Sequence, residues 1–397
     1  MNLVIHDLKS ADWQKIEHEY EGWTVLSDNG LIRPCGGCFH CWNKTPGICV
    51  MKDGFENMGQ LIHQAGEVVV ISRYAYGGFS GFVKNVIDRC LGYVLPQFEI
   101  IGGETHHQKR YEETKAFTFI FYGPALTKQE QDSARRYVRA LCSNFRGYVK
   151  AVIFREDGQE HLPPVTRSAC PSGRTVLLIG SMRGLNGNSG RLARKLAESL
   201  TNQHEIITIQ RYIHDFDRLV RSLEDAETLV LCMPLYVDGL PSQMIRLMER
   251  FGRGYQGGAK KIYLLANMGL YESCQLQSLF SAVRQWCAGM GFDYRGGLGI
   301  SAGELLGELM VHLPFRFGAT KKAAAGVDKL AEAINTGCAI SDIFCRAVRL
   351  SPGTLYCDSK RKLESDGESE WASVFRSVSE AVKILCRIGE GDHHEAP

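Results

Sequence analysis

Short apolar runs alternate with amphipathic helical patterns through most of this sequence, and the alternation occurs in two rounds. The first round predicts strands at 2–8, 23–27, 67–72, 116–123 and 148–154. The second round predicts strands at 175–180, 205–210, 228–234, 261–269 and 294–300. Helical patterns lie between them at 54–65, 80–92, 127–143, 189–201, 241–252, 275–290 and 318–336. This order predicts an α/β fold with two tandem, doubly wound, five-stranded parallel sheets that carry helices on both faces.

An internal match supports duplication of one α/β unit. Residues 68–89 align without gaps on residues 229–250, which pairs Gly78 with Gly239 and Ala75 with Tyr236. Both segments have the pattern of a buried strand, a glycine-containing loop and an amphipathic helix. The length of 397 residues also exceeds that of one ordinary domain.

These patterns divide the chain into four segments. We expect a first α/β domain at 1–160, a linker at 161–173, a second α/β domain at 174–337 and a C-terminal extension at 338–397. The extension contains a polar stretch and one amphipathic helical pattern, at 370–388, so we expect it to be helical and partly disordered.

The composition narrows the class of partner. A hydrophobic fraction of 44% is enough to form buried cores, and a net charge of +2 gives no reason to expect nucleic acid or a membrane surface as partner. No apolar run approaches the length that spans a bilayer, and Asp7 interrupts the apolar N-terminal stretch, so we expect no secretory signal and a cytoplasmic location.

The segment after the strand at 175–180 has the composition of an anion-binding loop. Glycines allow the backbone of the turn to adopt conformations that other residues avoid, and a helical pattern begins at 189. The loop offers hydroxyls, amides, one guanidinium and a glycine: Ser181, Ser189, Asn186, Asn188, Arg183 and Gly187. The free N–H groups and the dipole at the start of a helix attract an anion, so we predict that residues 181–189, the phosphate loop, bind a phosphate.

The spacing of the glycines excludes two common phosphate loops. No lysine follows them, as a nucleoside triphosphate loop requires, and Gly184, Gly187 and Gly190 do not match the dinucleotide fingerprint. A phosphate monoester is the remaining ligand class. The alternative is an ordinary strand-to-helix turn with a capping serine.

The pattern SxRGxxGNS resembles the FMN phosphate loop of the flavodoxin-like NAD(P)H-dependent FMN reductases. The segment 234–244 and the turn 267–271 are similar to the next two loops of that family. The resemblance implies FMN as cofactor, NADH or NADPH as cosubstrate, and further cofactor-binding residues: Pro234, Leu235, Tyr236, Val237, Asn267, Gly269 and Tyr271. An apolar or aromatic wall with backbone hydrogen bonds suits a flavin ring, whereas simple loop packing is the alternative for Tyr236. No catalytic side chain is assigned.

Four cysteines lie close together in the first half, at Cys35, Cys38, Cys41 and Cys49. The segment 32–54, which we name the cysteine loop, resembles the cysteine segment of the iron-sulfur flavoproteins. The spacing is compact enough for four thiolates to hold one iron-sulfur cubane (4Fe-4S). Zinc is one alternative, and a packed lid of free thiols is the other.

The first half departs from the flavin-binding pattern. No glycine follows its first strand, and the segment Arg73–Tyr76 replaces the usual Pro-x-Tyr, so we expect this half to bind no flavin on its own. It also carries an insertion at 95–113, whose His106 and His107 we expect to be solvated. Asp238 and Glu272, in loops of the second half, we expect to be solubilising residues.

The sequence therefore predicts a two-domain, FMN-dependent NAD(P)H oxidoreductase. It would pass reducing equivalents from a nicotinamide through FMN to a flavin, a quinone or a redox partner, with the cluster as a relay if one forms. The alternatives are an electron-transfer flavoprotein without its own small-molecule substrate, and a scaffold without cofactors. We expect a homo-oligomer or an intrachain pseudo-dimer.

Overall fold

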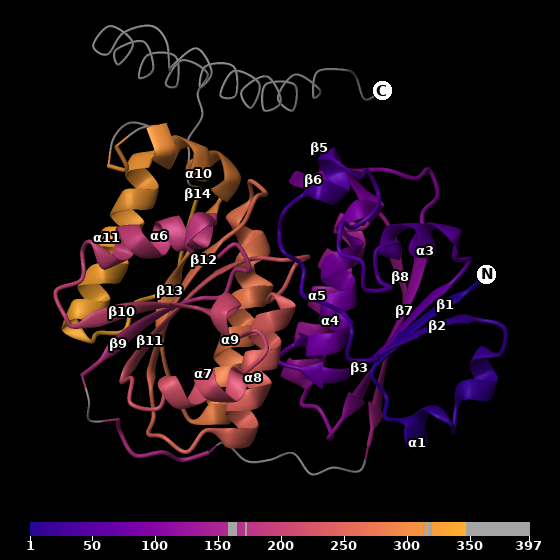
Figure 1. The fold of residues 1–397 in the computed structure, drawn as a ribbon, viewed down its shortest axis with the longest axis horizontal. Coiled ribbons are helices and arrows are strands. Elements are labelled where there is room, and N and C mark those ends of the chain that lie inside the picture. The colour runs from indigo at the N-terminus through magenta and orange to yellow at the C-terminus, as the bar shows by residue number, and fades with distance from the viewer. Residues whose placement is uncertain (158–164, 171–172, 313, 317–319, 347–397) are drawn as a thin grey trace, which may run out of the picture.

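The computed structural model describes residues 1–157, 165–170, 173–312, 314–316 and 320–346. They form two α/β lobes that lie side by side, the N-terminal lobe in indigo and purple and the C-terminal lobe in magenta to yellow in Figure 1. Much of the predicted linker and all of the predicted helix at 370–388 lie outside the described residues. Among the described helices, none has both the length and the apolar character that crossing a bilayer requires.

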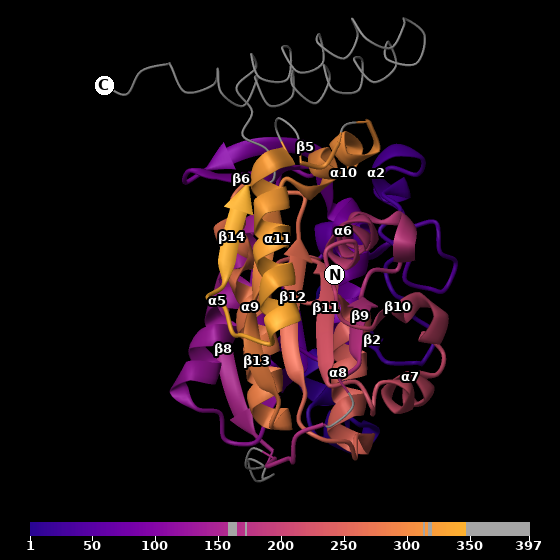
Figure 2. The same ribbon diagram turned by 90° about the vertical axis from the view of Figure 1, so that its left-hand side faces the viewer.

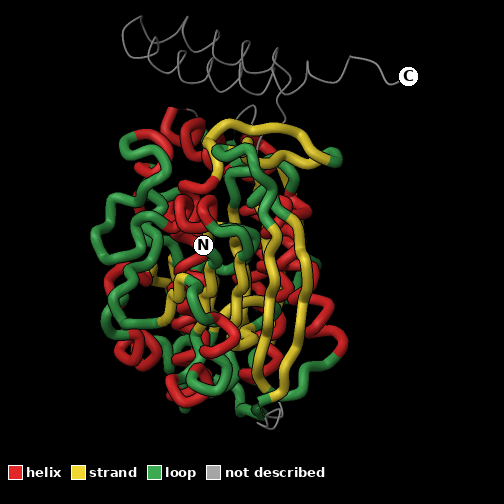
Figure 3. Tube along the Cα trace, turned by 90° about the vertical axis from the view of Figure 1, so that its right-hand side faces the viewer, coloured by secondary structure: helices red, strands yellow, loops and turns green. Residues whose placement is uncertain are grey.

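The N-terminal lobe is built on five parallel strands in the order β2-β1-β3-β7-β8. The strands are β1 (Leu3–His6), β2 (Thr24–Ser27), β3 (Val68–Ala75), β7 (Ala116–Gly123) and β8 (Tyr148–Glu156). Short β4 (Gly78–Phe79) folds back on β3, and β5 (Val94–Ile101) and β6 (Glu104–Lys109) form a separate antiparallel ribbon at one end of the lobe (Figures 1 and 3). This order is that of a flavodoxin-like fold.

Both faces of this sheet are buried because successive β-strand residues point to opposite sides. Leu3 and Ile5 face one core, which includes residues of α3 (Met58–Gln64), α4 (Gly81–Asp88) and α5 (Lys128–Asn144). Val4 faces the other core, which the segment with α1 (Ser10–Trp13) and a short helical turn (Glu17–Tyr20) covers. A further short helix, α2 (His40–Asn43), lies in the cysteine loop.

The C-terminal lobe repeats the pattern in the order β10-β9-β11-β12-β13-β14, all parallel. The strands are β9 (Thr175–Ile179), β10 (His204–Thr208), β11 (Thr228–Pro234), β12 (Lys261–Asn267), β13 (Asp293–Ser301) and β14 (Ile343–Arg346). Residues of α7 (Phe216–Ser222), α8 (Ser242–Gly254) and α9 (Gln277–Met290) join the core on one face. Residues of α6 (Asn188–Ala197), α10 (Gly303–His312) and α11 (Lys321–Thr336) join the core on the other.

The predicted strand-helix order is confirmed, and the strand β14 is the main addition. It extends the C-terminal sheet beyond the five predicted strands and lies beside α11 at the sheet edge (Figure 2). Its four residues are only half-buried or exposed, so they lack the apolar run that indicated the other strands. Within the extension predicted at 338–397, residues 343–346 are thus a strand, and residues 347–397 lie outside the described structure.

The internal sequence match is confirmed by the backbone. Ala75 pairs with Gly78 across a tight turn, and Tyr236 pairs with Gly239 in the same way. The two central residues of each turn have positive φ: Tyr76 (49°) and Gly77 (87°) in the first, Val237 (37°) and Asp238 (60°) in the second. Two positive φ values are characteristic of a type I′ turn, so both copies keep the same hairpin after the third strand.

The two lobes meet through equivalent helices, α4 and α8, which lie between the sheets in Figure 1. A Cβ on Gly81 would lie 2.5 Å from the Arg246 Cγ, and the Ser242 and Asn85 side chains are 3.3 Å apart. The alignment equates Gly81 with Ser242 and Asn85 with Arg246. The contact is therefore nearly self-complementary, as in a two-fold dimer interface.

Candidate functional site

The phosphate loop lies at the carboxyl edge of the C-terminal sheet. It follows β9, includes a helical turn (Gly184–Asn186), and leads into α6 at Asn188. Strand β9 lies between β10 and β11. The connection from β9 leads to β10 on one side of it, and the chain then crosses to β11 on the other side, so the strand order reverses at β9. Ligands of doubly wound sheets bind in the crevice at this reversal of strand order.

The first turn of α6 presents backbone donors with no side-chain cap. Gly187 occupies the N-cap position and makes no side-chain hydrogen bond, and the first helical bond runs from the Arg191 amide to the Gly187 carbonyl. The side chains of Ser181, Asn188 and Ser189 are all buried here, and the Asn188 Nδ2 has no partner among the described residues. Buried N–H donors without a partner at a helix N-terminus fit an anionic phosphate.

Two glycines keep this loop tight. A Cβ on Gly187 would lie 2.9 Å from the Arg183 Cβ, and one on Gly190 would lie 2.4 Å from the Gly184 carbonyl oxygen. The Ser181 hydroxyl accepts a hydrogen bond from the Arg183 amide at 3.2 Å, which fixes the start of the turn. Larger residues at positions 187 and 190 would therefore open the loop.

The structure brings the phosphate loop together with the other two predicted segments. The Ser189 hydroxyl donates a hydrogen bond to the Asn267 side-chain oxygen at 2.6 Å. The Leu235 amide donates to the Asn267 backbone carbonyl at 2.8 Å. Asn267 thus links the loop after β9 to the segment Pro234–Val237, which we name the flavin segment. Gly269 is exposed and Tyr271 is half-buried, with the Arg346 guanidinium 4.5 Å above its ring.

The cysteine loop of the N-terminal lobe contacts this same site. A Cβ on Gly37 would lie 2.4 Å from the Tyr236 hydroxyl and 3.6 Å from the Arg183 Cδ. Burial raises the pKa of Tyr236, and the nearby Cys35 and Asp88 raise it further. The two candidate sites that the sequence placed in different halves therefore lie against each other.

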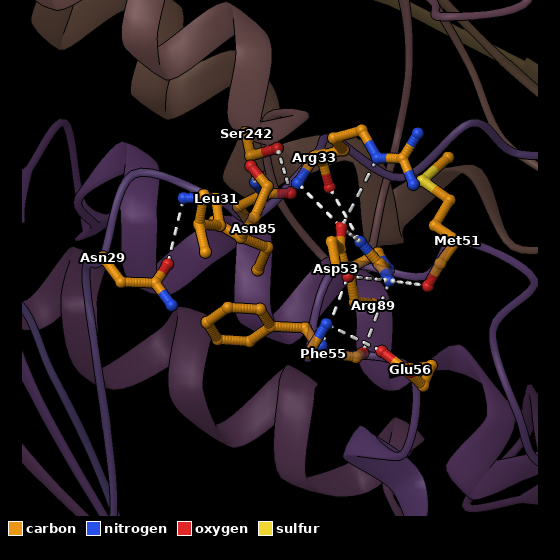
Figure 4. Close-up of polar contacts among 12 residues, drawn as sticks. Asn29, Leu31, Arg33, Met51, Asp53, Phe55, Glu56, Asn85, Arg89 and Ser242 are labelled. Carbon is orange, nitrogen blue, oxygen red and sulfur yellow. Dashed lines mark hydrogen bonds and ion pairs between the residues drawn. The ribbon is translucent and has the colours of Figure 1, made fainter.

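A buried ion pair closes the base of the cysteine loop (Figure 4). The Arg89 guanidinium donates to both carboxylate oxygens of Asp53, at 2.8 and 3.0 Å, and to the Arg33 carbonyl at 3.0 Å. It also reaches the carbonyls of Met51 and Phe55 at 3.4 Å. Burial opposes ionisation of Asp53, but the hydrogen bonds from Arg89 and the Arg33 amide outweigh it and lower the pKa of Asp53. One side chain thus holds both ends of the loop.

Cys35, Cys41 and Cys49 are half-buried in the loop, and Cys38 is exposed. Burial, with smaller contributions from neighbouring cysteines, raises the pKa of Cys35 to about 12 and that of Cys41 to about 11. The Trp42 ring stacks on Phe39 at 5.2 Å, and its N–H donates to two backbone carbonyls of the N-terminal lobe. These contacts hold the aromatic side chains of the loop against the N-terminal lobe.

The cysteine loop does not form the predicted metal site. Within the described residues, which include all four cysteines, no three His, Cys, Asp or Glu side chains gather closely enough to hold one metal ion. A cubane or a structural zinc needs four thiolates that converge on one point. The donor set as arranged does not fit either group, and we derive no electron-transfer step through it.

The equivalent edge of the N-terminal lobe has different chemistry. Strand β1 ends at His6, and Asp7 accepts a hydrogen bond from the Arg73 amide at 3.0 Å. The helix that follows, α1, has only four residues. A carboxylate followed by so short a helix is unsuited to a phosphate. That this lobe binds no flavin on its own stays a prediction.

Three residues expected to be solvated are instead hydrogen-bonded to other side chains, two of them across the boundary between the lobes. His106 is 4% exposed, and its Nδ1 lies 2.7 Å from the Asn144 side-chain oxygen. Asp238 is 2% exposed and accepts a hydrogen bond from the Asn144 side chain at 2.7 Å. Glu272 accepts two hydrogen bonds from Thr105. The expectation was wrong because the partners of Asp238 and Glu272 belong to the opposite lobe and Asn144 is distant from His106 in the sequence, so local polarity gives no signal of them. His107 is half-buried, and burial lowers its pKa to about 4.

Comparisons with known proteins found similarity to solved structures only. No protein-family model and no curated protein matches the sequence. Among solved structures, a flavone reductase is similar at 17% identity over 43% of this chain and 66% of its own, with a TM-score of 0.32. The NAD(P)H:quinone oxidoreductase from Methanothermobacter marburgensis is 14% identical over 42% of this chain and 96% of its own, with a TM-score of 0.32. An FMN-dependent NADH-azoreductase from Bacillus anthracis, in complex with FMN, is 12% identical over 42% of this chain and 99% of its own, with a TM-score of 0.30.

Proposed function

We propose that the C-terminal lobe binds FMN and that the protein uses it to pass reducing equivalents from NADH or NADPH to an acceptor. The observation that carries this proposal is the uncapped N-terminus of α6 at the point where the strand order reverses. Buried Ser181, Asn188 and Ser189 surround its free donors. The acceptor is a free flavin, a quinone or a redox protein.

Each group of residues has a distinct role in this proposal. The phosphate is held by Ser181, Arg183, Gly187, Asn188 and Ser189. The ring and ribityl chain lie along Pro234, Leu235, Tyr236 and Val237, with Asn267, Gly269 and Tyr271 at the neighbouring strand end. Bound FMN supplies the hydride and electron chemistry, which no side chain of this site offers. The Ser189–Asn267 hydrogen bond orients the second of these loops relative to the first.

We further propose a division of the chain in which one lobe binds the cofactor and the other covers it. Residues 174–337 form the FMN-binding domain, which β14 extends, and residues 1–160 form a domain without a phosphate loop. The cysteine loop contacts Tyr236 and Arg183 from the side of the N-terminal lobe. Covering the site in this way would limit the access of water to the flavin.

A comparison of FMN with riboflavin tests the phosphate loop. The two ligands differ only in the phosphate, and charge-assisted hydrogen bonds contribute roughly 1.5 to 3 kcal/mol, so FMN should bind about 10- to 100-fold more tightly. Flavin fluorescence quenching with the full chain measures both affinities. Asn188→Asp places a negative charge against the phosphate and should bring the two affinities close together.

The matched control is Asn186→Asp, because Asn186 is exposed on the same loop and its charge would be screened by water. Equal affinities for FMN and riboflavin in the unmodified protein would overturn the assignment of the loop. Equal effects of the two substitutions would also contradict it. Oxidation of NADH or NADPH by the FMN-loaded protein, with a quinone or free flavin as acceptor, then separates a reductase from an electron carrier.

A further inference from the structure

A cavity of about 530 Å³ lies between the two lobes. Helices α5 and α9 contribute to its walls, and so do the two equivalent hairpin turns at 75–78 and 236–239 and the β5–β6 ribbon. None of the residues assigned to FMN in the phosphate loop or the flavin segment lines it. The cavity is therefore a separate space on the other side of the hairpin turn at Asp238.

Three buried polar atoms on the cavity wall have no partner among the described residues. They are the Asp238 Oδ2, the Tyr137 hydroxyl and the Gln275 Oε1. Asp238 is 2% exposed and Tyr137 is 4% exposed. Buried polar atoms in folded proteins are nearly always hydrogen-bonded, so three such atoms around one cavity indicate a ligand that completes their hydrogen bonds.

A chain of side chains fixes the orientation of Asp238. The Asn144 Nδ2 donates a hydrogen bond to the Asp238 Oδ1. The side-chain oxygen of Asn144 is therefore the acceptor in its contact with His106, and the His106 Nδ1 carries the proton. Lys84, which also lines the cavity, is already bound to Asp88 and to the Tyr236 carbonyl. These contacts leave the Asp238 Oδ2 as an acceptor that the protein does not use.

The remaining wall combines aromatic and aliphatic side chains with serines and charged groups. The Phe79 and Tyr137 rings meet edge to face at 5.2 Å, and Leu240 and Ile245 complete this side. Arg284 lines the cavity but is paired with Asp342, and Arg136 donates to Ser133. The wall therefore offers apolar ring surface beside unused acceptor oxygens, and the carboxylates of Asp238 and Glu104 offset the charge of Arg136, so the cavity does not favour an anion.

We propose that this inter-lobe cavity binds an uncharged aromatic molecule that carries two hydrogen-bond donors, such as adjacent hydroxyl groups. Its donors meet the Asp238 carboxylate and the Gln275 oxygen, its acceptor meets the Tyr137 hydroxyl, and its ring lies against Phe79. This site goes beyond the proposed FMN site and does not depend on it. Because residues of both lobes line the cavity, the ligand also bridges them.

The test compares two probes that differ only in donors: a naphthalene with two adjacent hydroxyl groups and its dimethyl ether. Isothermal titration calorimetry is done with the full chain in the absence of flavin. The diol should bind at least about 10-fold more tightly than the ether, since each lost hydrogen bond to a charged group changes affinity by about that factor. Equal binding of the two probes, or no binding of the diol at millimolar concentration, would overturn the proposal.

Two variants localise the binding. Tyr137→Phe and Asp238→Asn should each weaken the diol by about 10-fold, and Asn is tolerated at the positive φ of position 238. Tyr93→Phe is the control, because Tyr93 is equally buried and does not line the cavity. Circular dichroism checks the fold. FMN binding by Tyr137→Phe should be unchanged, so failure of the cavity test and failure of the FMN proposal remain distinguishable. Unchanged diol affinity in both variants would place the probe elsewhere and sink the assignment.

Discussion

Replacing Gly37 by alanine probes the contact between the cysteine loop and the phosphate loop. Gly37 has a φ of 61°, a region in which an L-residue costs roughly 1 to 2 kcal/mol. The new Cβ would also lie 2.4 Å from the Tyr236 hydroxyl, well inside van der Waals contact. The hydroxyl would have to retreat from its packed position, and overpacking of this kind costs about 1 kcal/mol or more. We therefore expect Gly37→Ala to lower the free energy of unfolding by roughly 2 to 3 kcal/mol.

A double-mutant cycle separates the contact from the backbone strain. Tyr236→Phe removes the hydroxyl, so in that background Gly37→Ala should cost only the strain, and the coupling energy should be about 1 kcal/mol. Gly30→Ala is the matched control, because Gly30 has a φ of 74° and nothing lies within 4 Å of a Cβ built there. Urea denaturation followed by circular dichroism measures all four proteins and the control. If Gly37→Ala costs the same in both backgrounds, the cysteine loop does not rest on Tyr236.

Two further perturbations test other parts of the N-terminal lobe. Burial lowers the pKa of His6 to about 4, below the 6.5 of an unperturbed histidine, so the unfolded chain binds the proton first and stability falls as the pH drops from 6.5 towards 4. His6→Phe should reduce the loss of unfolding free energy between pH 6.5 and 4 by roughly 2 to 3 kcal/mol. In the control, where Gln replaces the exposed His18, the urea midpoint should change with pH as it does in the unmodified protein. Arg89→Lys should speed thiol alkylation in the cysteine loop several-fold, because lysine cannot reproduce the forked hydrogen bonds that close the loop. Arg33→Lys, at a side chain that is 55% exposed, should not change the alkylation rate, and equal rates in the two variants would rule out Arg89 as the clamp.

The strands and the internal duplication were predictable from the sequence because each leaves a local signal. Buried central strands require continuous apolar runs, and β9 has five consecutive buried residues. The equivalence of Gly78 and Gly239 was predictable because both copies keep the spacing of the hairpin turn. Strand β14 was not predictable, since its residues are only half-buried at a sheet edge.

The candidate site was only partly predictable. The donors of the phosphate loop follow from the residues between β9 and α6, because a helix N-terminus supplies them locally. The roles of His106 and Asp238 were not accessible, because their hydrogen bonds to Asn144 join residues distant in the sequence. The spacing of the four cysteines suggested convergence on a metal, but among the described residues no three of them gather closely enough to hold one metal ion.

The sequence alone determined the two rounds of strands and helices and the anion-binding character of the loop at 181–189. Both depend on periodicity and on backbone groups that neighbouring residues leave free. Only the tertiary structure decided that Gly37 rests on Tyr236, and that the lobes enclose a cavity with unused acceptor atoms. The physical reason is that the packing of α4 against α8 sets these contacts, and such packing depends on the fit of two surfaces made from separate halves of the chain.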